Sequence, residues 1–471
     1  MKMNKVILGM AAAIGLASAN VMALPLSQYD ATGTNTLRVF ASGASAQDGG
    51  FQQWFRLQCA AGTLDIYRDG SNQRMFFCNV NSTGIPGFPT AAAGGKKVAM
   101  FKSSVGGSGN GVQPVANQTL LGFLNPPNIT GCVTTVVPAS GAFNGYNDHL
   151  CTAGTLQNAV SDAGISDVEP KLFGASAAEI GRLAVSSQNA VVWGVPVTTN
   201  LRNALQTAQG LVAGSDTEAN MPTLSRQQVT SVYVGGLASW DDFTDPVTGT
   251  GMAATAGVAD ANVYLCRRVA SSGTQASYEV NFLRQRCIAD APAMMSTLNF
   301  PATVSEGSGT SNVISCLNGH NTAGRWAMGL FSTENQEGTG GWRFVKVDSK
   351  APTLLNVVKG GYPYFSEQSI QWRKSPATNL PTGLTLTLLN NFKAEMGSPA
   401  IIANLNQGFN HTWGQAGLLA LPTNGHLPPA TPYTAANVTA TPVSSQSKSY
   451  VNGSPNNCLE PALFAPQHAG G

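Results

Sequence analysis

The sequence predicts an α/β fold organised as more than one unit. At several places a strand-like run passes into a turn of small residues and then into a pattern with helical spacing. With 471 residues, the chain is long enough for two domains or one large discontinuous unit. Charged residues make up only 11% of it, whereas 52 glycines and 26 prolines favour short elements joined by many turns, which argues against a coiled coil.

The clearest strand, turn and helix pattern lies in residues 262–283. An apolar run ends at Arg268, Ser272-Gly273-Thr274 forms the turn, and large apolar residues then recur at helical spacing. A helix N-terminus offers unpaired N–H groups and the positive end of the helix dipole, to which an arginine adds formal charge. This arrangement fits a tetrahedral oxyanion. The same turn residues also occur simply as helix caps, so both readings stay open.

Two further turns of this kind lie nearer the N-terminus. The strand-like run 37–41 leads into Ser42-Gly43-Ala44-Ser45-Ala46 and an amphipathic stretch, and the run 98–101 leads into a glycine-rich segment around Ser108. Glycines let the backbone approach a ligand closely, although a flexible surface loop would have the same composition. Neither a dinucleotide fingerprint, a P-loop nor a G-x-S-x-G elbow is present, so a nucleotide site or hydrolase elbow is unsupported.

A short apolar segment at Gly164-Ile165 also ends in Ser166-Asp167, just before Pro170. Ser166 or Asp167 could simply cap a following helix. Alternatively, a buried carboxylate repels an oxyanion unless the ligand donates a proton to it. Asp167 in such a site would select protonated phosphate against sulfate.

Two segments are expected to cross between domains. Residues 190–197 form a continuous apolar strand broken by glycine and proline, and residues 360–364 are the expected return. Residues 384–396 and 399–405 have helical patterns. From about Leu421 the chain is rich in proline, threonine, asparagine and serine, which predicts an extended surface tail.

The N-terminus has the features of a secretory signal peptide. Lys2 and Lys5 precede an apolar run, and small residues follow near Ala23. No cysteine follows this expected cleavage site, so no lipid or other membrane anchor is expected. Removing residues 1–23 takes two lysines from the 26 basic residues and leaves 24 basic against 24 acidic. A neutral mature chain argues against binding to nucleic acid, and any anion site must be local.

The eight cysteines favour disulfides, because their number is even, the chain is expected to be exported and no C-x-x-C pair suggests zinc. Pairing of sequence neighbours joins Cys59 to Cys78, Cys132 to Cys151 and Cys266 to Cys287, which leaves Cys316 for Cys458. For Cys266 and Cys287, a strand rising to the turn and a helix returning from it could bring the two sulfurs together. No metal and no cofactor are expected.

Taken in order, these segments resemble the periplasmic phosphate-binding proteins of ABC phosphate importers. The resemblance runs from Leu37 to about Leu419, and Arg268 with Ser272-Gly273-Thr274 is its most specific part. It implies a two-lobe periplasmic binding protein fold of type II with two hinge crossings. It also implies a set of ligand-binding residues: Ser45, Ala46, Ser108, Asp167, Arg268, Ser272, Gly273 and Thr274.

The resemblance further implies a domain organisation and a way of working. Residues 24–187 and 371–471 would form lobe I, and residues 188–370 lobe II. The protein would be a periplasmic or secreted monomer that binds inorganic phosphate or a related oxyanion, passes it to an ABC permease and catalyses no reaction.

The sequence also departs from the pattern of this family. Ala46-Gln47 stands where an aromatic residue and a proline are usual, and Ala270 stands where an acidic partner of the arginine is usual. A long insertion carries Cys132 and Cys151. The insertion and the tail leave open a matrix or surface protein that reuses the fold. An exported phosphatase is a third alternative, but it would need a base, and the five histidines are scattered.

Overall fold

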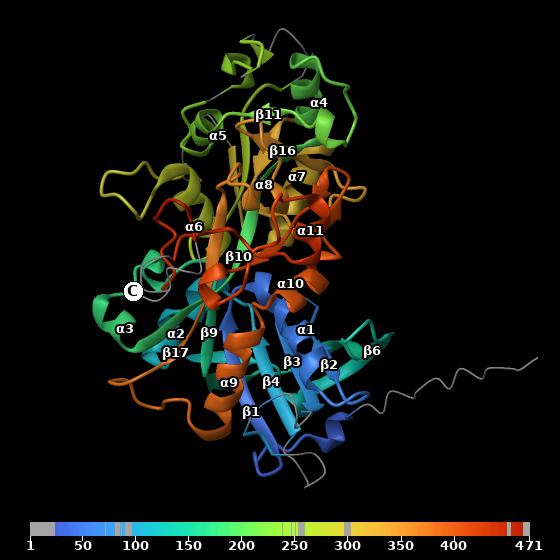
Figure 1. Cartoon of the computed structure of the whole chain (residues 1–471), viewed down its shortest axis with the longest axis vertical. Helices are drawn as coiled ribbons and strands as arrows, with labels where there is room; N and C mark the ends of the chain where they lie inside the picture. Colours follow the sequence, from blue (N-terminus) through green and yellow to red (C-terminus); the bar gives the residue numbers. More distant parts are fainter. Residues whose placement is uncertain are drawn as a thin grey trace, which may run out of the picture.

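The computed structural model describes residues 24–70, 72–80, 85, 87–89, 97–237, 239–245, 247–249, 251–252, 260–295, 303–449 and 454–464. These residues form two lobes, each with its own hydrophobic core, one above the other in Figure 1. The expected signal peptide, residues 1–23, lies outside the described residues. Within the described part of the chain, no helix has the length and apolar character needed to cross a membrane.

Two long strands connect the lobes. Strand β10 (Leu183–Thr198) and strand β17 (Phe365–Arg373) pair antiparallel, from Leu183 opposite Arg373 to Val192 opposite Phe365. In lobe I β17 pairs with β9, whereas the far end of β10 pairs with β14 and β16 of lobe II. Both strands are almost entirely buried. The apolar run 190–197 predicts this for β10, whereas β17 consists mostly of polar residues and begins just after residues 360–364, where the return was expected. The two-lobe α/β fold with two hinge crossings is therefore confirmed.

Lobe I is built on a mixed sheet in which β1 pairs parallel with both β4 and β9, and β6 lies at the end of the strand order. Its core contains Trp54 and Phe55 of α1, with the Phe55 ring stacked on Phe76 at 5.0 Å between centroids. The elements of this lobe are β1 (Thr36–Gly43), α1 (Asp48–Gln58), β2 (Asp65–Arg68), β3 (Gln73–Asn79), β4 (Lys97–Ser103), α2 (Gln113–Asn117), β5 (Leu120–Phe123), β6 (Ile129–Val137), β7 (Tyr146–Ala153), β8 (Gln157–Val160), β9 (Ala163–Ser166), α3 (Ala177–Gly181) and α9 (Gly383–Glu395).

Lobe II has a second sheet, in which β12 lies parallel between β13 and β14. Its core gathers large aromatic side chains, including Trp193, Tyr233 and Tyr278. The elements are α4 (Thr199–Ala208), β11 (Thr223–Leu224), α5 (Arg226–Tyr233), β12 (Tyr264–Arg268), α6 (Gly273–Tyr278), β13 (Thr303–Gly307), α7 (Thr310–Thr322), β14 (Ala327–Gly329), β15 (Phe331–Ser332), β16 (Trp342–Val347) and α8 (Leu354–Val358).

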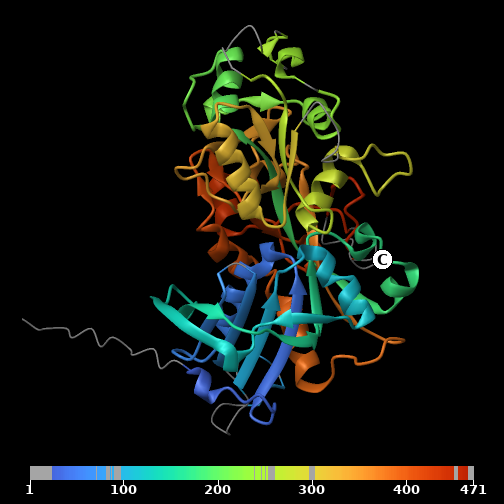
Figure 2. The ribbon, with the colours of Figure 1, turned by 180° about the vertical axis from the view of Figure 1, so that it is seen from behind.

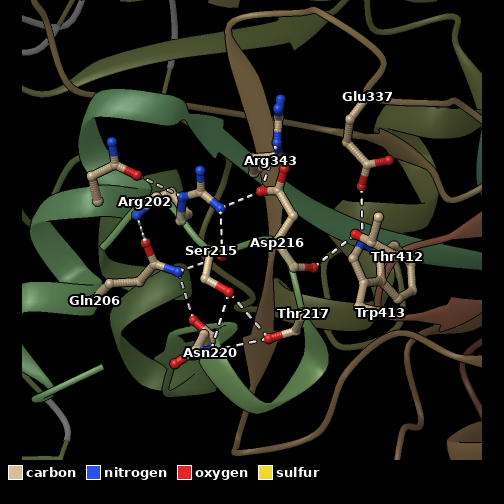
Figure 3. A network of polar contacts seen from close by, with 12 residues as sticks. Arg202, Gln206, Ser215, Asp216, Thr217, Asn220, Glu337, Arg343, Thr412 and Trp413 are labelled. Atoms are coloured by element: carbon tan, nitrogen blue, oxygen red, sulfur yellow. Dashed lines mark hydrogen bonds and ion pairs between the residues drawn. The ribbon is translucent and has the colours of Figure 1, made fainter. Parts of the chain in front are cut away.

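A polar network holds the loop after α4 onto lobe II (Figure 3). The Asp216 carboxylate forms ion pairs with Arg202 of α4 and with Arg343 of β16, the second at 2.9 Å. Its backbone carbonyl accepts a hydrogen bond of 2.7 Å from Thr412. The network therefore fixes this loop to a helix, a strand and the C-terminal part of the chain.

All eight cysteines form disulfides, but only two of the four expected pairs are confirmed. Cys59 pairs with Cys78, and Cys132 pairs with Cys151. The other bonds are Cys266–Cys316 and Cys287–Cys458, so the expected Cys266–Cys287 and Cys316–Cys458 pairs are wrong.

The packing of lobe II explains this exchange of partners. Helix α7 packs on β12, which brings Cys316 to Cys266. After α6 the chain forms a π-helical turn, Glu279–Leu283, and Arg284 takes a left-handed conformation with φ 55°. The chain does not return along β12, and Cys287 meets the tail instead.

The C-terminal part differs from the expected surface tail. Leu418 to Leu421, Val438 and Val443 belong to the lobe II core, and residues 443–449 are buried. In Figures 1 and 2 this red segment lies beside the upper lobe and the junction between the lobes. Its elements are α10 (Pro399–Asn406), β18 (Asn410–His411), β19 (Gly414–Gln415), β20 (Leu418–Ala420), α11 (Ala435–Ala440), β21 (Gln446–Ser447) and β22 (Ala462–Leu463).

The end of this segment is tied to both crossings and both lobes. Ser449 hydrogen-bonds Ser187 of β10 at 2.7 Å, and the buried carboxylate of Glu367 in β17 accepts from the hydroxyls of Ser447 and Ser449. Asn457 donates to Glu169 of lobe I, and the next residue, Cys458, is bonded to lobe II through Cys287. We call residues 443–449 and 454–458 the C-terminal strap.

Candidate functional site

Three of the expected ligand-binding residues meet at the junction of the lobes. Ser108 lies in a 3₁₀ turn, Gly107–Gly111, and Asp167 follows directly after β9. Gly273 is the first residue of α6 in lobe II. Each comes from a segment that the sequence predicts to be a turn at the end of a strand, and the sheets bring these ends together.

Ser108 and Asp167 are linked by two hydrogen bonds. The Ser108 hydroxyl donates to Asp167 Oδ2 at 3.1 Å and accepts from the Asp167 backbone N–H at 3.0 Å. Asp167 Oδ1 accepts a third hydrogen bond, of 2.7 Å, from the Gln368 side chain of β17. Asp167 therefore does not act as a helix cap: Glu169 occupies the position before the next short helix.

Gly273 makes the contact between the lobes at this point. A Cβ atom added to Gly273 would lie 2.1 Å from Ser108 Oγ and 2.4 Å from Asp167 Oδ2, which is too close for any side chain. Beside it, the Gly109 N–H of lobe I donates to the Ser271 carbonyl of lobe II at 3.0 Å. The first turn of α6 therefore lies directly against the Ser108–Asp167 pair.

Arg268 is buried near this pair but is not bonded to it. Its guanidinium donates to Thr310 Oγ1 at 3.1 Å and to the Ser308 carbonyl at 2.8 Å, and its buried Nε has no described partner. Within the described part of the chain, no ion pair involves Arg268 or Asp167. The site thus holds a buried cation and a buried carboxylate that interact only through space.

The electrostatics reflect this lack of direct pairing. Burial raises the pKa of Asp167, despite the hydrogen bonds from Gln368 and Ser108 and the charge of Arg268. Burial lowers the pKa of Arg268, and only the charge of Asp167 opposes that shift. Both groups would gain from a partner that supplies a proton to the carboxylate and a negative charge to the guanidinium.

The remaining expected residues are placed differently. Ser272 and Thr274 are buried on either side of Gly273, and the Ser272 side chain makes no capping hydrogen bond to α6. Ser45 is exposed and Ala46 is half-buried in the turn before α1. No described hydrogen bond joins the Ser45 side chain to the Ser108–Asp167 pair, so its role as a ligand stays a prediction.

Sequence reasoning missed several polar residues around the pair. Lys102 is fully buried at the end of β4, donates to the Gly43 and Ala44 carbonyls and lies 3.2 Å from Asp48. A lysine that continues an apolar strand into two serines was a usable signal for this position. Gln368 gave no such signal, because it stands among other polar residues of β17.

Glu334 adds a further acid on the lobe II side. Burial, together with the nearby charges of Asp167 and Asp48, raises the pKa of Glu334 to about 8. Its described hydrogen bond comes from the Ser332 hydroxyl at 3.1 Å. Glu334 is therefore mostly protonated at neutral pH and adds little negative charge to the site.

One cluster in the described residues has the spacing of metal ligands, namely Cys266, Cys316 and His320. The two sulfurs are bonded to each other, so neither is a thiolate. A metal would need a thiolate or another donor here. The cluster offers no metal site while the disulfide is intact.

No family model matches this chain, and neither does any curated protein. Solved structures of similar fold include an ABC-type phosphate transport receptor from Vibrio cholerae, 15% identical with a TM-score of 0.39 over 78% of this chain and 98% of the receptor. An ancestral soluble variant of the human phosphate binding protein is 14% identical with a TM-score of 0.43 over 89% and 99% of the two chains. PstS from Borrelia burgdorferi is 11% identical with a TM-score of 0.35 over 78% and 96%. These values are low, and the two-lobe architecture rests on the strand order and cores of this chain itself.

Proposed function

We propose that this protein binds inorganic phosphate, or a closely related oxyanion that carries a proton, between its two lobes and catalyses no reaction on it. One observation carries the proposal: Asp167 and Arg268 are both buried at the lobe junction, influence each other's pKa and form no ion pair. The hydroxyl of a monohydrogen phosphate ion would donate a hydrogen bond to Asp167, and its other oxygens would accept hydrogen bonds from Arg268.

Ligand entry requires the lobes to separate. Gly273 lies against Ser108, so the described arrangement is the closed one. Rotation at β10 and β17 would open the junction, and closure on the ligand would then surround it with donors from both lobes.

The wider role follows from this site together with the sequence. The expected signal peptide supports a periplasmic or secreted protein. We infer that it works as a monomer and delivers its ligand to an ABC permease, as the resemblance to the binding proteins of ABC phosphate importers implies. An Asp167 carboxylate that requires a proton donor supports phosphate over sulfate as the ligand.

Isothermal titration with phosphate and with sulfate tests the proposal. We expect heat with phosphate and little with sulfate. Arg268→Ala should weaken phosphate binding by about 10- to 100-fold, because a hydrogen bond to a charged group is worth about 1.5–3 kcal/mol. Absence of heat with phosphate, or equal heat with both ions, would contradict the proposal.

A second candidate function is a surface or matrix protein. Strand β6 lies at the end of the strand order of the sheet, residues 130–136 of it are exposed, and it carries no charged residue. Such an edge is suited to pairing with another strand. This role would be favoured if the protein is found in the extracellular matrix and its expression level does not change with the phosphate concentration of the medium.

A further inference from the structure

A surface cavity of about 910 Å³ lies directly outside the phosphate site proposed above. Gly109 and Ser271, whose backbones bond the two lobes together, form part of its wall. Residues of both lobes line it, among them Gln113, Thr119, Lys171 and Glu179 of lobe I and Ser271 and Arg286 of lobe II. A molecule bound here would contact both lobes at once.

Two of the three charged residues in this cavity already have partners. Arg286 pairs with Glu279 at 2.9 Å and lies over the ring of Phe173, 6.0 Å from its centroid. Glu179 accepts hydrogen bonds from Ser176 and from the Asn117 amide, the latter at 2.6 Å. These contacts shape the wall and leave neither charge free for a ligand.

Lys171 is different. It is exposed, and no hydrogen bond or ion pair within the described residues involves its ammonium group. Gln113, Thr119 and Ser271 also line the cavity, and no described hydrogen bond involves their side chains either. The cavity therefore offers one uncommitted cation among several neutral hydrogen-bonding groups.

We propose that this cavity binds an acidic saccharide of about two sugar units. Its volume lies in the range of about 300–1,000 Å³ that is typical of sites for small organic ligands. The free cation would pair with one carboxylate of such a ligand, any second carboxylate would remain in solvent, and the neutral amide and hydroxyl groups match sugar hydroxyls. A nucleotide fits less well, because it would need an open aromatic face, and Arg286 already covers a face of Phe173.

This site does not depend on the proposed phosphate site. Arg268 is buried and does not line the cavity, and Lys171 makes no described contact with the Ser108–Asp167 pair. A saccharide that bridges the lobes would also favour the closed arrangement, since it binds that arrangement preferentially.

Isothermal titration of the full mature protein with digalacturonic acid tests the proposal, with maltose as the neutral disaccharide. We expect binding of digalacturonic acid that weakens as salt is added, and little binding of maltose. Lys171→Gln should weaken it roughly tenfold, and Gln113→Ala by a smaller factor. The control Lys359→Gln removes another exposed lysine, outside the cavity, and should leave binding unchanged.

Arg268→Ala separates this proposal from the previous one. It should lose phosphate binding and keep digalacturonic acid binding. The saccharide proposal is overturned by any of three results: no heat with digalacturonic acid at millimolar concentration, equal binding of maltose, or an unchanged affinity in Lys171→Gln. Failure of phosphate binding in the native protein, with saccharide binding intact, would overturn only the phosphate proposal.

Discussion

The carboxylates of Asp216 and Asp167 differ in how they are paired with arginine and in the direction of their pKa shifts. Asp216 is held directly by two arginines (Figure 3), and although burial works against it, hydrogen bonds from Arg343 and Arg202 keep its pKa below the ordinary value. Asp167 is more deeply buried, its arginine is bonded elsewhere, and its pKa is raised. The first arrangement is complete without a ligand, whereas the second has unused binding capacity. Separation of charged groups, more than their presence, distinguishes a candidate site from a structural network.

The largest expected effect comes from adding a side chain at Gly273, where the two lobes meet. In Gly273→Ala the new methyl group would collide with Ser108 and Asp167 and hold the lobes apart. We expect phosphate binding to be abolished and the free energy of unfolding to fall by about 1–3 kcal/mol, as in other overpacked interiors. Gly319→Ala is the matched control, because nothing lies within 4 Å of a Cβ at that position. Normal phosphate binding by Gly273→Ala would show that the junction is not the site.

The next largest effect is expected at Asp216, in the polar network that holds the loop after α4. Asp216→Ala would leave Arg202 and Arg343 facing each other without a counter-charge. We expect the free energy of unfolding in urea to fall by about 2–3 kcal/mol, less than for a fully buried pair because Asp216 is partly exposed. Phosphate affinity should not change. Asp290→Ala, at an exposed aspartate, serves as control, and equal stability of the two variants would contradict the assigned role.

Asp167→Asn should show the reverse behaviour. The amide keeps the shape of the side chain and removes a buried charge that lacks an ion pair, so we expect stability to change by less than about 1 kcal/mol or to rise. Phosphate affinity should fall and sulfate affinity should increase, because the acceptor of the ligand proton is lost and its repulsion of sulfate disappears. Titration with both ions checks this. An unchanged ratio of phosphate to sulfate affinity would show that Asp167 does not accept a hydrogen bond from a protonated ligand.

The smallest effect is a difference in pH dependence. The raised pKa of Asp167 means that its contribution to stability is fully present below pH 3.8 and is lost as the pH rises through the folded-state pKa. The lowered pKa of Asp216 means that its contribution is present above pH 3.8 and is lost as the pH falls through the folded-state pKa. Unfolding free energies of the native protein, Asp167→Asn and Asp216→Asn between pH 3 and 7 should therefore diverge in opposite directions. Parallel curves would refute the contrast between the two carboxylates.

Much of the fold could be predicted from local patterns. The helical spacing of Phe51, Trp54 and Phe55 gave α1, and the continuous apolar run from Ala190 gave the buried part of β10. These elements follow from which side chains must be buried, and that information is local. The proximity of Ser108 and Asp167 was also expected, as an implication of the resemblance to the phosphate-binding proteins.

The rest depends on contacts between distant segments. The partners of Cys266 and Cys287 are set by the packing of α7 on β12 and by the chain reversal at Arg284, which no local pattern reports. Gln368 reaches Asp167 only because β17 pairs with β9. The direction of the Arg268 guanidinium toward Thr310 likewise requires the position of α7.

The C-terminal strap sets a mechanical limit on any ligand exchange. Asn457 is hydrogen-bonded to Glu169 in one lobe, and its neighbour Cys458 is covalently joined to the other through Cys287. Two adjacent residues of the C-terminal strap therefore hold the two lobes together. Moving the lobes apart at this point must first break the hydrogen bonds between Asn457 and Glu169. A reducing agent that breaks the Cys287–Cys458 disulfide should therefore speed the exchange of an anion bound between the lobes. The rate of release would then depend on the redox state of the surroundings.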